Sequence, residues 1–148
     1  MHHLIPKVLE YFPYWNQIVH REETHGQIFL QTRGILKIET DLIEDLGEYR
    51  VRSGKPVILL HKFLTRQYRP WVFFHECGHD MFHSPLSCTF STDMRKKIET
   101  EANIVAAVAL IPVEVLRTKH AWEIQEEYGY PLKLILFRKY IYDTYDKF

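Results

Sequence analysis

Two prolines and two histidines place the strongest constraint on how this chain can fold. Pro70 and Pro85 bracket residues 71–83, a run rich in aromatic and apolar side chains, and prolines so placed are typical of the start and the end of a helix. His75 and His79 lie within this predicted helix. At about 100° per residue they project about 40° apart, one turn from each other. Two imidazoles in this arrangement can bind one metal ion.

The residues between these histidines complete an H-E-x-x-H motif. Glu76 lies beside the pair, where its carboxylate can reach a water bound to the metal. Cys77 projects to the opposite face, so we expect a buried core residue rather than a ligand. Gly78 inside a helix costs about 1 kcal/mol relative to alanine, and its presence predicts that another backbone packs closely there. A surface motif that binds no metal is the alternative.

A second predicted helix, which ends before Pro112, offers a carboxylate as the third ligand. Taking Ile98 as the centre of its apolar stripe, Glu101 lies about 60° away and inside the stripe, where an unpaired carboxylate would be costly. Glu99 lies about 100° away, at the edge of the stripe, and reaches solvent more easily. The sequence therefore predicts Glu101 as the third ligand, with a salt bridge to a basic neighbour as the alternative.

The rest of the pattern predicts an α+β fold. Ser53-Gly54 is a turn signal between two β-prone runs, which predicts a hairpin. The expected elements, in chain order, are a helix near 6–19 kinked at Pro13, a strand at 36–39, hairpin strands at 48–52 and 56–60, the helix at 71–83, a helix that begins at Ser91 or Thr92, a helix from Pro112 to before Gly129, and a last helix to about Tyr142. Helix, strands and then helices are typical of α+β proteins rather than of alternating β-α-β units.

Length and composition bound the class of protein. With 148 residues, of which 46% are hydrophobic, the chain suits a single domain over 1–148, with a core at about 45–112 and a helical part at 113–148. Nineteen basic and nineteen acidic residues argue against direct binding of nucleic acid. Two cysteines are not a disulfide framework, no apolar run is long enough to span a membrane, and no signal-peptide pattern is present, so we expect a cytoplasmic protein.

Taken together, these motifs resemble the ImmA/IrrE family of metallopeptidases. The resemblance rests on the segment from His75 to His83, on Glu99-Thr100-Glu101-Ala102-Asn103, and on Leu110-Ile111-Pro112. It covers roughly Asp45 to Pro112. It implies a zincin-like fold of the gluzincin type, with a small sheet packed on the H-E-x-x-H helix and a second helix that carries a metal ligand.

The resemblance also implies an activity. Zinc would be bound by His75, His79 and Glu101, and Glu76 would be the general base of a zinc-dependent endopeptidase. Manganese or cobalt would suit the same ligands. Members of this family are often encoded beside a helix-turn-helix repressor and act by cleaving it, so a regulatory protein of this kind is the expected substrate and partner.

The other histidines carry weaker signals. His83 lies one further turn along the ligand face, where it could donate to an oxyanion or support a ligand, although a packed or capping histidine is the favoured interpretation. His20, His25, His61 and His120 have no partner at ligand spacing, and we expect them on the surface.

Two other functions stay open on the sequence alone. A binding module could keep this scaffold without hydrolysing anything and inactivate a repressor by sequestering it. A structural metal site could stabilise a small domain, which would require four protein ligands and no open position. The intact Glu76 argues against the binding module.

Overall fold

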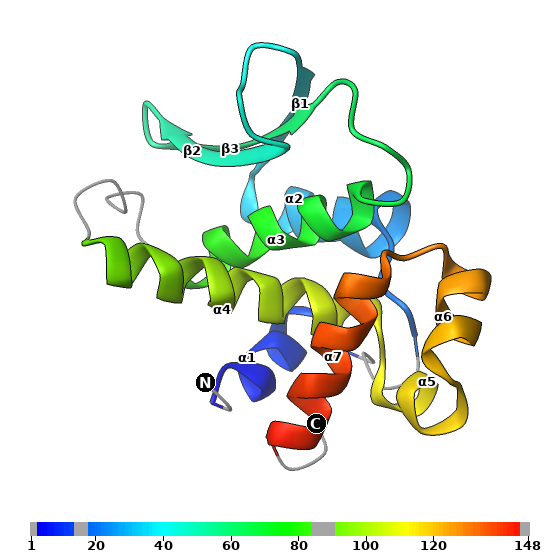
Figure 1. Ribbon diagram of the computed structural model, residues 1–148. Helices are drawn as coiled ribbons and strands as arrows, with labels where there is room; N and C mark the ends of the chain where they lie inside the picture. The colour runs from blue at the N-terminus through cyan, green and yellow to red at the C-terminus, as the bar shows by residue number, and fades with distance from the viewer. Residues whose placement is uncertain (1–2, 14–17, 84–90, 146–148) are drawn as a thin grey trace.

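The computed structural model describes residues 3–13, 18–83 and 91–145. Its elements in chain order are α1 (Leu4–Tyr11), the π-helical turn η1 (Glu22–Gly26), α2 (Gln27–Arg33), β1 (Leu36–Thr40), β2 (Gly47–Arg52), β3 (Lys55–His61), α3 (Arg69–Phe82), α4 (Thr92–Leu110), α5 (Val113–Thr118), α6 (Ala121–Tyr128) and α7 (Leu132–Thr144) (Figure 1). The predicted α+β class is confirmed. No helix among the described residues is long and apolar enough to cross a membrane.

The three strands form one sheet in the order β1-β3-β2. β2 and β3 are antiparallel and form the predicted hairpin, in which Arg52 pairs with Lys55. The two residues between them, Ser53 and Gly54, have φ angles of 50° and 75°. A two-residue hairpin turn with positive φ at both positions is the type that matches the twist of the strands. β1 is parallel to β3 and forms the other edge of the sheet.

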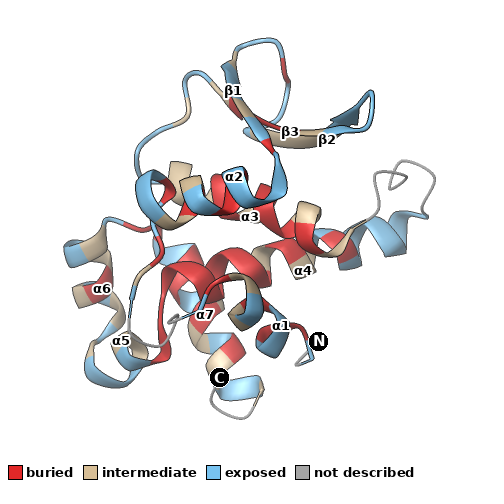
Figure 2. Cartoon of the chain, turned by 180° about the vertical axis from the view of Figure 1, so that it is seen from behind, coloured by how far each residue is buried: buried red, intermediate tan, exposed pale blue. Residues whose placement is uncertain are grey.

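The helices form layers beneath this sheet. Figure 1 shows α3 directly against the sheet, α4 alongside α3, and α1 and α7 on the far side of α4. Alternate residues of β3, Ile58 and Leu60, are fully buried in the core that α3 and α4 share. Residues 104–111 of α4 and its C-cap are all buried, and Figure 2 shows the continuous buried stretch. α4 is therefore the central element of the core.

The contact between α3 and α4 is as close as the helical glycine predicts. A Cβ atom on Gly78 would lie 3.1 Å from the Cα atom of Ala102 and 3.1 Å from the Cβ atom of Val105. Real side chains rarely approach so closely, so the glycine allows the two backbones to pack together. Cys77 is completely buried, as expected for a core residue.

Two helix predictions differ from the structure. The helix expected near 6–19 ends at Tyr11, and residues 14–17 lie outside the described part of the chain. The helix expected from Pro112 to before Gly129 is divided into α5 and α6, because the backbone is extended at Lys119 and His120. The backbone N–H of His120 donates to the Glu123 carboxylate at 2.9 Å, in a capping box that starts a new helix.

His20 does not lie on the surface as expected. Its side chain is 1% exposed and its ring packs 4.8 Å from Phe12 and 4.5 Å from His25, measured between ring centroids. The prediction was wrong because a neutral imidazole can pack among aromatic rings without a ligand partner. His25 and His61 are partly buried, and His120 is exposed.

Burial of His20 should make stability depend on pH. Burial and the nearby His25 lower the pKa of His20 from 6.5 to about 4. Between these values the unfolded chain binds a proton that the folded chain does not, so the stabilisation is complete above about pH 6.5 and is lost as the pH falls to about 4. At about 1.4 kcal/mol per pKa unit, the free energy of unfolding should drop by about 2–3 kcal/mol.

Urea unfolding at pH 7 and pH 4.5, with a chelator present, checks this dependence. The His20→Leu variant lacks the titrating imidazole, so its free energy of unfolding should change less between the two pH values than that of the wild type. Equal changes in the two proteins would show that His20 is not the group responsible.

Candidate metal centre

The first two ligand candidates come from the middle of α3. Pro70 lies in the first turn of this helix, where its missing N–H loses no hydrogen bond. The helix ends at Phe82, so the H-E-x-x-H motif lies in regular helix and not in a loop. The rings of His75 and His79 are on one face with their centroids 4.9 Å apart. This part of the site follows the sequence prediction.

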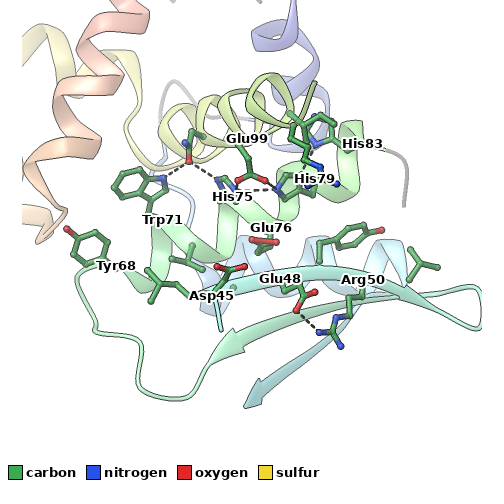
Figure 3. Close-up of a pocket in the computed structure, with 18 residues that line it drawn as sticks. Asp45, Glu48, Arg50, Tyr68, Trp71, His75, Glu76, His79, His83 and Glu99 are labelled. Carbon is green, nitrogen blue, oxygen red and sulfur yellow. Dashed lines mark hydrogen bonds and ion pairs between the residues drawn. The ribbon is translucent and has the colours of Figure 1, made fainter. Parts of the chain in front are cut away.

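The third side chain comes from α4, beside α3. Ser91 caps this helix by accepting from the backbone N–H of Met94 at 3.3 Å, which confirms one of the two predicted starts. Glu99 reaches between the two histidines (Figure 3). Its Oε2 atom lies 2.9 Å from Nε2 of His75, and its Oε1 atom lies 3.1 Å from Nε2 of His79.

Glu101, the carboxylate expected in this place, is turned to His83 instead. Its Oε2 atom lies 3.0 Å from Nε2 of His83, and its side chain is 13% exposed, against 59% for Glu99. The helical projection placed the ligand within the apolar stripe of α4, whereas the histidines face an open cleft along the edge of the contact between α3 and α4. A carboxylate at the edge of the stripe reaches that cleft, and the one inside the stripe does not.

The donor set fits a divalent metal ion. Nδ1 of His75 donates to Oδ1 of Asn103 at 2.7 Å, so the lone pair of this ring is on Nε2. That Nε2 atom lies 3.2 Å from Nε2 of His79. Ligands bound to tetrahedral zinc at 2.0–2.1 Å lie about 3.3 Å from one another. Two histidine nitrogens and one carboxylate at such separations are the ligand set of many catalytic zinc sites.

Glu76 lies between α3 and β2, below the histidine pair (Figure 3). Its side chain is buried, and burial raises its pKa to about 7. The strand comes close because its first residue is Gly47, where a Cβ atom would lie 2.5 Å from Cγ1 of Val72 and 3.2 Å from Cγ of Glu76. A carboxyl group with a pKa near 7 can both accept and donate a proton at neutral pH.

Asn103 is a site residue that the sequence pattern alone did not single out. Its Oδ1 atom accepts from His75 and also from Nε1–H of Trp71, at 3.1 Å. An outer partner of this kind fixes the orientation of a metal-binding ring. The signal was present in the sequence, because Asn103 stands four residues after Glu99 and therefore on the same face of the helix.

A cleft of about 810 Å³ opens over these residues. β2, α3 and α4 all contribute to its walls, and the cluster of His75, His79 and Glu99 lies along one of them. β2 is an edge strand of the sheet. The cleft therefore exposes both the ligand cluster and a strand edge.

A known protein family matches most of this chain. The family model for the IrrE N-terminal-like domain (Peptidase_M78) matches residues 31–138, which include the H-E-x-x-H motif and both Glu99 and Glu101 of α4. A search of curated proteins finds no match. Peptidases of this family are metal-dependent, which agrees with the ligand set of the cleft. The chain belongs to the IrrE N-terminal-like, or ImmA/IrrE, family of metallopeptidases.

Proposed function

We propose that this chain is a zinc-dependent endopeptidase that cleaves a specific regulatory protein, such as a helix-turn-helix repressor. One observation carries the proposal. The Nε2 atoms of His75 and His79 and the carboxylate of Glu99 converge at 2.9 to 3.2 Å from one another on the wall of an open cleft, with Glu76 on the same helical turn. This is the arrangement of a hydrolytic site.

Three protein ligands leave one position of a tetrahedral ion for water or substrate, unlike a structural site with four. When bound, zinc supplies Lewis-acid activation of water and of the peptide carbonyl, and manganese or cobalt would suit the same ligands. His75, His79 and Glu99 would hold the ion. His75 is oriented by Asn103, so its ring need not reorganise when the ion binds.

Glu76 moves the proton. It lies on the same helical turn as the two histidines and lines the cleft, where its carboxylate can take a proton from the attacking water. It then delivers the proton to the amine of the leaving peptide. The close approach of β2 at Gly47 keeps bulk water away from this carboxylate.

The edge strand β2 supports a peptide as the substrate. In the described part of the chain β2 pairs with β3 on one side, and its other edge borders the cleft. An extended peptide can add to such an edge through its backbone groups, and this places a peptide bond beside the metal. Family membership and the balanced charge of the chain favour a protein over a nucleic acid as the partner.

The test begins with a search for a helix-turn-helix regulator encoded beside this gene and then measures its cleavage. The purified chain and the purified helix-turn-helix protein should yield defined fragments in the presence of zinc. Cleavage should stop with a chelator and return when zinc is restored in excess. A stable complex in which the regulator stays intact under all these conditions would overturn the peptidase and favour sequestration.

A further inference from the structure

A second hydrogen-bonded pair lies behind the ligand cluster, at the end of α3. Nε2 of His83 lies 3.0 Å from Oε2 of Glu101, and these side chains are 6% and 13% exposed. Nδ1 of His83 lies 2.9 Å from Nδ1 of His79. Three side chains therefore form one continuous hydrogen-bonded chain from α4 to a candidate metal ligand.

The chemistry of these groups fixes the direction of each hydrogen bond. An ionised carboxylate can only accept, so His83 donates from Nε2–H to Glu101. A neutral imidazole with its proton on Nε2 has a lone pair on Nδ1, so His83 accepts there from Nδ1–H of His79. His79 then has its lone pair on Nε2, which lies 3.1 Å from Glu99. The chain therefore selects the tautomer of His79 that can bind a metal ion.

We propose that Glu101 and His83 are positioning residues, which together hold His79 in the tautomer and orientation that the metal ion requires. This inference rests on the proposed metal site and deepens it, because it places Glu101 behind a ligand instead of among the ligands. It also accounts for an acidic side chain inside the apolar stripe of α4, since a buried carboxylate needs a hydrogen-bond donor and His83 provides one.

The two ligand histidines are held by acceptors of different strength. Nδ1 of His75 bonds to the neutral amide oxygen of Asn103 at 2.7 Å. Nδ1 of His79 bonds to the imidazole of His83, whose other nitrogen bonds to the carboxylate of Glu101. Hydrogen bonds to ionised groups are stronger than those between neutral groups, and here the ionised carboxylate bonds to His83 and therefore acts on His79 through it. Loss of a partner of this kind generally lowers metal affinity 10- to 100-fold, and the same loss is expected here.

Two substitutions of His83 separate a positioning role from a packing role. His83→Leu introduces an apolar side chain of similar bulk, which cannot accept a hydrogen bond from His79. His83→Asn places an amide oxygen near the position of Nδ1, so it can accept again. Zinc affinity, measured by competition with a chromogenic chelator, should fall 10- to 100-fold in His83→Leu and return to within about fivefold of the wild type in His83→Asn.

Glu101→Gln tests whether Glu101 is a ligand. The cobalt-substituted protein reports coordination through its absorption spectrum, because band intensity depends on the number and geometry of the ligands. At saturating cobalt, Glu101→Gln and His83→Leu should keep the wild-type spectrum, whereas Glu99→Gln should change it. Thermal unfolding with a chelator present confirms that each variant is folded.

These experiments distinguish failure of the positioning role from failure of the proposed metal site. If His83→Leu binds zinc as tightly as the wild type, or if His83→Asn is no better than His83→Leu, the positioning role is wrong and the metal site stands. If Glu101→Gln changes the cobalt spectrum as Glu99→Gln does, Glu101 is itself a ligand and the inference is overturned. A wild-type chain that binds no zinc would overturn the proposed function and this inference together.

Discussion

Replacing Glu76 by glutamine should leave zinc affinity within a few-fold of the wild type and reduce cleavage of the partner regulator by about a hundred- to ten-thousandfold. The ligand cluster contains His75, His79 and Glu99 but not Glu76, so the metal site should survive. Glutamine has almost the same shape as glutamate but cannot take a proton from water at neutral pH. The loss should therefore fall on the chemical step and not on substrate binding.

The expected effect appears in kcat, with KM nearly unchanged. Glu76 is buried against β2, so the unfolding temperature of the variant without metal must be measured as well. Glu126→Gln is a matched control, because Glu126 is exposed on α6, away from the cleft. It should cleave as the wild type does. If Glu76→Gln cleaved at the wild-type rate, another group would have to be the base and the proposed mechanism would be wrong.

The part of the fold around the H-E-x-x-H helix could be predicted because its signals are local. Pro70 stands in the first turn of the helix and Gly54 in the turn of the hairpin, and each restricts the backbone within a few residues. Gly78 indicated a tertiary contact, since a glycine destabilises a helix interior unless a close neighbour requires the missing side chain. These residues act through backbone geometry, which sequence spacing describes well.

The carboxylate that lies nearest the two histidines could not be predicted because its position depends on how two helices pack. The projection of α4 ranked Glu101 and Glu99 by distance from an apolar stripe, on the assumption that the site lies in the core. The histidines face a cleft, and the cleft selects the residue at the stripe's edge. The alternative interpretation, in which Glu101 pairs with a basic neighbour, is nearer to the structure, because the partner of Glu101 is the imidazole of His83.

The N-terminal region was predicted least well, because its side chains contact residues far away in the sequence. Glu22 has a buried carboxylate in η1, held by Lys37 at 2.7 Å and by Arg69 at 2.8 Å. Arg69 also forms an ion pair with Glu39, so two acidic side chains hold this arginine in the fold. Partners 15 to 47 positions apart leave no periodic signal in the sequence.

Zinc should raise the unfolding temperature of the wild-type chain by about 8–16 °C when its free concentration is about a thousand times the dissociation constant. The ligands come from two helices, with His75 and His79 on α3 and Glu99 on α4, so only the folded chain brings them together. Ligand binding to the folded state alone contributes about 4 kcal/mol at that concentration. For a domain of this size, 1 kcal/mol corresponds to about 2–4 °C.

Glu99→Gln should lose most of this stabilisation. The variant keeps both histidines but replaces the charged ligand with a weak neutral one, so its zinc affinity should fall at least about a hundredfold. At the same zinc concentration the remaining stabilisation is then at most about 1.4 kcal/mol. Because Glu99 is 59% exposed, the unfolding temperature without metal should change little, which separates loss of a ligand from loss of the fold.

Glu126→Gln again provides the control, and it should keep the full zinc effect. Differential scanning calorimetry with a chelator and with buffered zinc measures all three proteins under the same conditions. A full zinc effect in Glu99→Gln would mean that the carboxylate between the histidines is not a ligand. The Nε2 atoms of His75 and His79 would still lie 3.2 Å apart and could bind the metal. The third ligand would then have to come from elsewhere in the chain.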